Sequence, residues 1–285
     1  MRIDRFVGVI AGAAGTVIAV GCGTQHAPSA ANETPDLAAA VSHTQDQTAR
    51  IATTISTKTL GMTMSYTATG VFDFARSRGM ITIPSPVDMT EIFVPPTTYI
   101  KPPAAATADG GALPKGKTWL ALPDGTSSAS ALLALGGGGG DPADLLASLT
   151  AMSSRVTRIG TATIRGVPVT GFALEVDPAK AGVKVPGADR APVEALAKVF
   201  GAGEIPVDVW VDDQNLVRQE RLTLPLPAGS GAPGGTHLIL TTDFYDFGLR
   251  VQVSAPSSSL VETEASQFVA GASGPGESAT ATPPA

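Results

Sequence analysis

The chain has 285 residues, of which 19 are basic and 25 acidic, giving a formal net charge of −6, and it contains one cysteine. An acidic chain without a basic run is poorly suited to nucleic acid or to anionic lipid headgroups, since both are bound by Lys and Arg. One cysteine excludes an internal disulfide. The 32 glycines and 23 prolines favour a turn-rich β domain over a helical bundle.

The first 22 residues have the pattern of an export signal. Arg2 and Arg5 precede a run of apolar and small residues (6–20) that leads to Cys22. This run is shorter than the roughly 20 apolar residues of a membrane-spanning helix. Its ending resembles a bacterial lipobox, although that motif usually has leucine in place of Ala19. We therefore predict a signal peptide over 1–21 and lipidation, palmitate included, at Cys22; a plain secretory signal with a lone thiol is the alternative.

The predicted lipid would attach the protein to the extracytoplasmic face of the cell membrane. Small polar residues over 22–35 predict a flexible tether. We expect one domain over 36–262, followed by a disordered tail over 263–285, which is polar, rich in proline and free of aromatics beyond Phe268. The first predicted element of the domain is a helix over 37–50, opened by Pro35 and Asp36.

The clearest local pattern is an alternation of residue types over 62–74. One face carries apolar or small side chains, and the other is polar apart from Val71. This predicts a one-sided strand of about 40 Å, roughly twice the usual length. Gly70 indicates a bend or the close approach of another strand. Turn signals of proline and glycine then separate shorter predicted strands of an antiparallel meander, at 79–83, 89–94, 97–100 and 118–122.

The segment 124–140 ends in five glycines and is interpreted as a loop. A phosphate-binding loop would need Gly-Lys-Ser/Thr, and here Asp141 and Pro142 follow. These two residues instead predict the start of a helix that ends near Met152. The remaining predicted elements are strands at 156–164 and 167–176, a helix at 192–200, a hairpin at 205–224 around the turn 212–215, and strands at 236–245 and 249–253.

The order of these pieces resembles the actinobacterial lipoproteins of the LppX/LprA/LprF/LprG group and, more distantly, the LolA/LolB carriers. The resemblance spans about 36–256, with local matches at 160–176, 206–224 and 241–256. It implies an α+β fold: a strongly curved antiparallel β-sheet, or incomplete barrel, with helices covering its concave face. In some members the fold encloses an apolar cavity for acyl chains of envelope lipids. The segments 124–140 and 95–103 and the tail depart from the pattern.

Several apolar residues on the predicted strands could line such a pocket. Each could equally be ordinary core packing, although methionine adapts well to irregular ligands. The pocket candidates are Met62, Met64, Tyr66, Phe72, Phe74, Phe172 and Leu174.

No catalytic or metal-binding constellation stands out. The histidines do not have the spacing of metal ligands, and there is no Gly-x-Ser-x-Gly elbow. Four aspartates in two loops are interpreted as polar turn residues and not as a calcium site: Asp212, Asp213, Asp243 and Asp246. We therefore expect no enzymatic activity, no catalytic residues, no metal and no cofactor.

Two functions remain open. The protein could bind or carry a lipid or another hydrophobic ligand in an apolar pocket between sheet and helices. Alternatively, it could be an anchored adaptor or regulator that binds another cell-envelope protein without a small-molecule ligand. An open apolar cavity favours the first function, and a packed interior or an exposed apolar patch favours the second. The expected partners are the membrane, through Cys22, and a lipid or an envelope protein, but no nucleic acid.

Overall fold

The computed structural model describes residues 33–59, 62–84, 88–103, 113–123, 142–177, 204–226 and 233–263. These residues form two α-helices, α1 (Glu33–Gln45) and α3 (Pro142–Met152), and two 3-10 turns, η2 (Phe74–Arg76) and η4 (Ser258–Leu260). The strands are β1 (Thr48–Thr59), β2 (Met62–Asp73), β3 (Arg78–Ile83), β4 (Met89–Val94), β5 (Thr97–Lys101), β6 (Trp119–Pro123), β7 (Ser153–Ile164), β8 (Val167–Val176), β9 (Ile205–Asp212), β10 (Val217–Pro225), β11 (His237–Tyr245) and β12 (Val261–Glu262).

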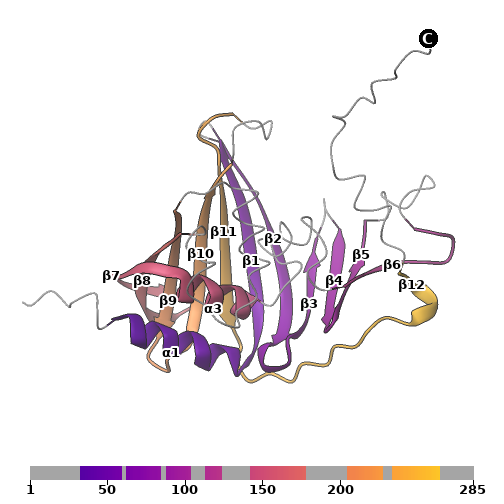
Figure 1. Ribbon diagram of the computed structural model, residues 1–285, viewed down its shortest axis with the longest axis horizontal. Coiled ribbons are helices and arrows are strands. Elements are labelled where there is room, and N and C mark those ends of the chain that lie inside the picture. Colours follow the sequence, from indigo (N-terminus) through magenta and orange to yellow (C-terminus); the bar gives the residue numbers. More distant parts are fainter. Residues whose placement is uncertain are drawn as a thin grey trace, which may run out of the picture.

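All twelve strands belong to one sheet, in the order β12-β6-β5-β4-β3-β2-β1-β11-β10-β9-β8-β7 (Figure 1). Neighbouring strands are antiparallel except β12 and β6, which run parallel. The edge strands β7 and β12 do not pair with each other within the described residues, so the sheet stays open. The α+β incomplete barrel predicted from the sequence is confirmed.

The two helices pack side by side on the concave face of the sheet, which we call the inner face (Figure 1). Their buried residues belong to the same hydrophobic cluster as the inner-facing residues of the central strands, including Leu37, Leu146 and Leu149 from the helices. The predicted helix at 142–152 is confirmed, with the same bounds. The helices contact β7, β8 and β10 and the turn η2, so they cover one part of the inner face.

The long strand and the meander that follows it are also confirmed. Strands β2 to β6 pair in sequence order, each with the next. Gly70 marks a close approach, as its position suggested: a Cβ there would lie 2.4 Å from the backbone oxygen of Met80. Gly79 has a similar role, since a Cβ there would lie 2.6 Å from the ring of Phe72. Both glycines let adjacent strands and side chains pack without a gap.

The predictions for 37–59 were wrong in two respects. The helix begins at Glu33, inside the predicted tether, and ends at Gln45, so residues 48–50 belong to a strand. That strand, β1, was missed although threonine and isoleucine dominate it, residues that favour strands. Because β1 lies between β2 and β11, it buries Ala49, Ile51 and Ile55, and this burial outweighs a weak helical preference.

Two hairpin turns follow the chemistry of their residues. Arg165 and Gly166, between β7 and β8, have φ values of 48° and 82°, as a two-residue turn of the mirror-image type requires. Between β9 and β10, Asp212 Oδ1 accepts hydrogen bonds from the backbone N–H groups of Gln214 and Leu216, both at 2.9 Å. Asn215 is left-handed there, with φ of 61°. Both turns confirm the sequence-based prediction.

The C-terminal segment differs from the prediction, because 249–253 forms no strand. After β11, the Gly248 N–H donates to the Thr48 carbonyl at 2.9 Å, and the Thr48 hydroxyl donates to the Leu249 carbonyl at 2.7 Å. The chain then passes along the lower end of the sheet in Figure 1 and reaches β12 beside β6. There Lys117 Nζ donates to the Val261 carbonyl at 2.7 Å.

The other predicted strands are present with bounds shifted by a few residues at most. The predicted signal peptide, most of the tether, the glycine-rich segment 124–140, the helix at 192–200 and the tail from 264 lie outside the described residues.

Candidate functional site

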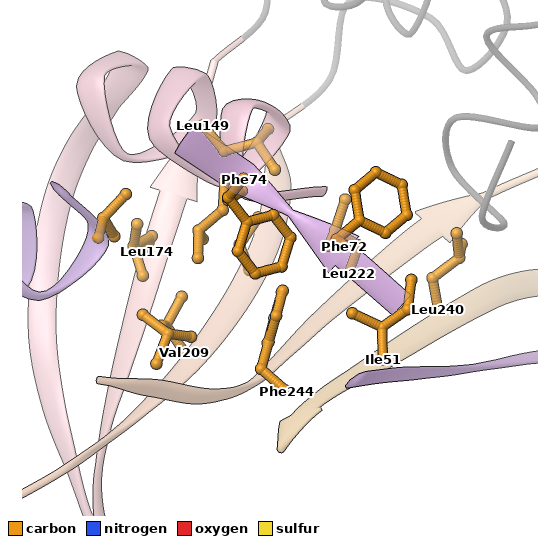
Figure 2. Packing of buried hydrophobic residues seen from close by; sticks show 14 of the residues in the cluster. Ile51, Phe72, Phe74, Leu149, Leu174, Val209, Leu222, Leu240 and Phe244 are labelled. Carbon is orange, nitrogen blue, oxygen red and sulfur yellow. The ribbon is translucent and has the colours of Figure 1, made fainter. Parts of the chain in front are cut away.

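The seven pocket candidates divide into two groups. Four of them are buried members of the main hydrophobic cluster: Phe72, Phe74, Phe172 and Leu174. Figure 2 shows the first two rings among Leu149 of α3 and residues of the central strands such as Leu222, Leu240 and Phe244. These four side chains are therefore core residues in this structure, and the interior around them is packed.

A chain of phenylalanine rings crosses this core. The Phe72 ring centroid lies 5.3 Å from that of Phe93 and 5.7 Å from that of Phe74, and Phe74 in turn lies 5.9 Å from Phe244. These separations are typical of favourable aromatic pairs. Because the rings come from β4, β2, η2 and β11, they connect the two halves of the sheet across its inner face.

The other three candidates, Met62, Met64 and Tyr66, are exposed. Their exposed fractions are 71%, 78% and 37%, although they alternate with polar residues on the same face of β2 as the buried Ala68 and Phe72. We call these three residues the inner-face strip. Partial desolvation of the Tyr66 phenol, which is the least exposed of the three side chains, raises its pKa above the usual value, so the hydroxyl is neutral over the physiological range. The strip extends the apolar inner face beyond the packed core.

Polar residues lie between the strip and the ring cluster. The hydroxyls of Thr53 on β1 and Thr242 on β11 are hydrogen-bonded at 3.1 Å, and both residues are buried. Thr53 pairs with Ala68 on one side, and Thr242 pairs with the buried Glu220 on β10. The inner face is thus apolar with a short polar row across its middle.

Sequence reasoning missed a second buried carboxyl on the inner face, Glu91 of β4. Its side chain is 0% exposed, and neither carboxyl oxygen has a hydrogen-bond partner among the described residues. Desolvation raises its pKa from the usual 4.5 to about 8. The signal was present in the sequence, since Glu91 alternates with Met89 and Phe93 on the apolar face of a predicted strand.

The loop aspartates are engaged in ion pairs. Asp212 pairs with Arg218 at 2.5 Å, and Asp246 pairs with Arg50 at 3.3 Å. Asp243 pairs with Arg165 at 2.8 Å. These contacts give three of the four aspartates a structural role. Among the described residues, no group of three or more His, Cys, Asp or Glu side chains is arranged to hold a metal ion.

A hollow of about 390 Å³ lies between the β7–β8 turn and the end of β11. Its lining includes Arg165, whose guanidinium lies 4.0 Å from the centre of the Tyr245 ring, and Arg218, which lies 4.8 Å from that of Phe247. Since each arginine is already paired with an aspartate, the hollow offers no uncompensated positive charge. We assign it to the packing of the hairpin against β11.

No helix in the described ranges has both the length and the apolar character to cross a membrane. No protein-family model matches the sequence, and no curated protein matches it.

Several solved structures are similar to the chain at low sequence identity. LprF from Mycobacterium bovis is 12% identical over 80% of this chain and 98% of its own, with a TM-score of 0.44. The lipoprotein LppX from Mycobacterium tuberculosis is 12% identical over 77% of this chain and 99% of its own, with a TM-score of 0.40. A LolA superfamily protein from Nitrosomonas europaea is 10% identical over 79% and 95%, with a TM-score of 0.34. Proteins of the group that the sequence resembles are thus among the structures to which this chain is similar.

Proposed function

We propose that this protein is a membrane-anchored lipoprotein that binds or carries a lipid or another hydrophobic ligand on the inner face of its sheet. The observation that supports this most is the inner-face strip of Met62, Met64 and Tyr66, which is exposed although it continues the buried apolar face of β2. The packed core around Phe72 and Leu174 moves the proposed site away from four of the seven sequence candidates and towards the strip.

An acyl chain that lies along the strip would gain affinity from burial alone. Each Å² of apolar surface removed from water contributes about 25 cal/mol, and the flexible methionine side chains can adapt to ligands of irregular shape. Few polar groups are needed in such a site. No catalytic group is required, in keeping with a carrier that is not an enzyme.

A second candidate function is supported by the same exposure. A packed interior with an exposed apolar patch is also typical of a protein that binds another protein. An anchored adaptor would use the strip to contact a partner in the cell envelope and would carry no lipid. The two functions differ in whether a small hydrophobic molecule accompanies the purified protein.

The direct test is lipid analysis of the protein from residue 22 onward, with Cys22→Ser, by native mass spectrometry followed by solvent extraction. The carrier function predicts a near-stoichiometric lipid or saturable uptake of a fluorescent fatty acid. A clean apo mass without uptake would sink the carrier proposal and leave the adaptor, to be pursued by crosslinking on the cell surface.

Exchanging the two strip methionines for serine (Met62→Ser with Met64→Ser) is expected to weaken binding of a fluorescent fatty acid about 10-fold or more, because the ligand loses about 100 Å² of apolar contact at about 25 cal/mol per Å². Since both side chains are exposed, the free energy of unfolding should change by no more than about 0.5 kcal/mol. The matched control is Met80→Ser, which alters a methionine that is 38% exposed on the opposite face of β3. Equal binding by all three proteins would show that the strip is not the site.

Changing Cys22 to serine in the full chain is expected to abolish incorporation of labelled palmitate and to move the protein out of the membrane fraction. The physical reason is that an anchor of more than one acyl chain provides the membrane affinity, and the acidic chain offers no basic run to replace it. Cell fractionation measures the change. Unaltered membrane association of the variant would contradict lipidation at Cys22.

A further inference from the structure

Glu91 occupies an apolar position in the sheet. Its cross-strand neighbours are Ile81 of β3 and Ile100 of β5, and the residues two places away on β4 are Met89 and Phe93. All four side chains share its face, and none can form a strong hydrogen bond, since the sulfur of Met89 is only a weak acceptor. The register therefore places a carboxyl at the centre of a hydrophobic surface.

Within the described part of the chain, no hydrogen bond reaches this carboxyl. The side chain is 0% exposed, and both oxygens lack a partner. A buried water molecule needs two to four polar partners, and among the described residues these four neighbouring side chains offer only the weakly accepting sulfur of Met89. A buried polar group in this state destabilises the folded protein, and a hydrogen bond from a bound ligand would relieve that cost.

We propose that Glu91 is the polar contact of the hydrophobic-ligand site, where its buried, unpartnered carboxyl group hydrogen-bonds an uncharged, oxygen-bearing head group such as the hydroxyl of an acylglycerol. This inference rests on the proposed function and adds to it the residue that selects the ligand. A protonated carboxyl donates one hydrogen bond and accepts others, so it matches a hydroxyl, which also does both.

The surroundings favour a neutral head group over an amine. No other titratable side chain lies on the inner-facing positions of β3, β4 and β5, which carry Gly79, Ile81, Ile83, Met89, Phe93, Thr98 and Ile100. Burial raises the pKa of Glu91 to about 8, so the group is protonated at neutral pH. A protonated amine would bind best to the ionised form of Glu91. The apolar surroundings disfavour that charged form.

The position of Glu91 also fits a ligand whose tail lies on the inner-face strip. Glu91 is in register with Ile81 and Gly70, and Gly70 lies four residues along β2 from Tyr66, the nearest residue of the strip. Two strand spacings and four residues correspond to about 16 Å on a flat sheet, and curvature shortens this distance. A long acyl chain can span it, so the head group and the tail would contact two parts of one face.

The test compares wild type, Glu91→Gln and Glu91→Leu, each carrying Cys22→Ser, for displacement of a fluorescent fatty acid by a monoacylglycerol, by an alkane and by a primary amine, all of equal chain length. Wild type should prefer the monoacylglycerol at least 10-fold. The leucine variant should lose this preference and still bind the alkane, whereas glutamine, which keeps a donor and an acceptor, should retain most of it. The wild-type preference should fall between pH 7 and pH 9, and that of the glutamine variant should not.

Four results would overturn the inference. An unchanged preference in the leucine variant would show that Glu91 does not contact the head group. Tighter wild-type binding of a long-chain amine than of the monoacylglycerol would contradict a neutral partner. Equal wild-type binding of the monoacylglycerol and the alkane would show that Glu91 does not select the ligand, but it would leave the proposed function intact. Failure of wild type to bind any of the ligands would overturn both this inference and the proposed function.

Discussion

Replacing Phe72 with alanine is expected to lower the free energy of unfolding by about 3 to 5 kcal/mol. The ring is fully buried, it packs against Phe74 and Phe93, and it lies over Gly79 at a distance that leaves no room even for a methyl group. Its removal would leave a cavity at the junction between the helix-covered part of the sheet and the β3–β6 part. Urea denaturation followed by circular dichroism measures the loss.

The matched control for this variant is Met64→Ala. Met64 lies on the same strand and on the same face, but it is 78% exposed. Its truncation should change the free energy of unfolding by less than about 0.5 kcal/mol. The pair therefore compares the buried end of β2 with the exposed end that carries the proposed ligand site. If Phe72→Ala left stability unchanged and abolished lipid uptake, Phe72 would line a pocket, contrary to the packed interior described above.

Replacing Glu91 with leucine is expected to stabilise the protein by about 3 kcal/mol at pH 7. At 1.36 kcal/mol per pH unit, keeping this carboxyl protonated from its usual pKa of 4.5 up to pH 7 costs about that amount. Below pH 4.5 the group is protonated in both the folded and the unfolded chain and has no effect on the pH dependence. As the pH rises from 4.5 to about 8, only the unfolded chain releases its proton, so wild-type stability falls.

The measurement is urea denaturation of wild type and Glu91→Leu at pH 5 and pH 8. The difference between the two proteins should grow by about 4 kcal/mol over this range, because the leucine variant lacks this titration. Glu204→Leu, at an exposed position just before β9, is the control and should track wild type. Parallel pH dependences of wild type and Glu91→Leu would contradict a neutral buried carboxyl in the folded protein.

The sequence allowed local structure to be predicted where neighbouring residues determine it. The alternation in β2, the helix start at Pro142 and the Asp212 turn each depend on a few adjacent residues, and all three are confirmed. Strand β1 was missed because its threonines are weak evidence on their own. Its conformation depends on burial between β2 and β11, which are distant in the sequence.

The exposure of the candidate residues could not be predicted from the sequence for a related reason. Alternation identified which residues of β2 share a face but not where the helices end on that face. Whether Met64 is exposed and Phe72 buried depends on this tertiary placement. For Glu91, the sequence showed its place between Met89 and Phe93 on an apolar face. Its lack of a hydrogen-bond partner could not be predicted, because it depends on which residues of β3 and β5 lie beside it.

The path of the C-terminal segment also constrains the order in which the molecule can assemble. Strand β12 pairs with β6, so the outer edge of β6 stays open until the last residues of the described chain have arrived. A contact this distant in sequence forms late, since closing a long loop costs entropy before the pairing compensates for it. Until then, an unpaired edge of a large sheet is available for aggregation. A polypeptide truncated before residue 261 would keep that edge of β6 open. Strand β12 therefore protects the protein from aggregation through this edge.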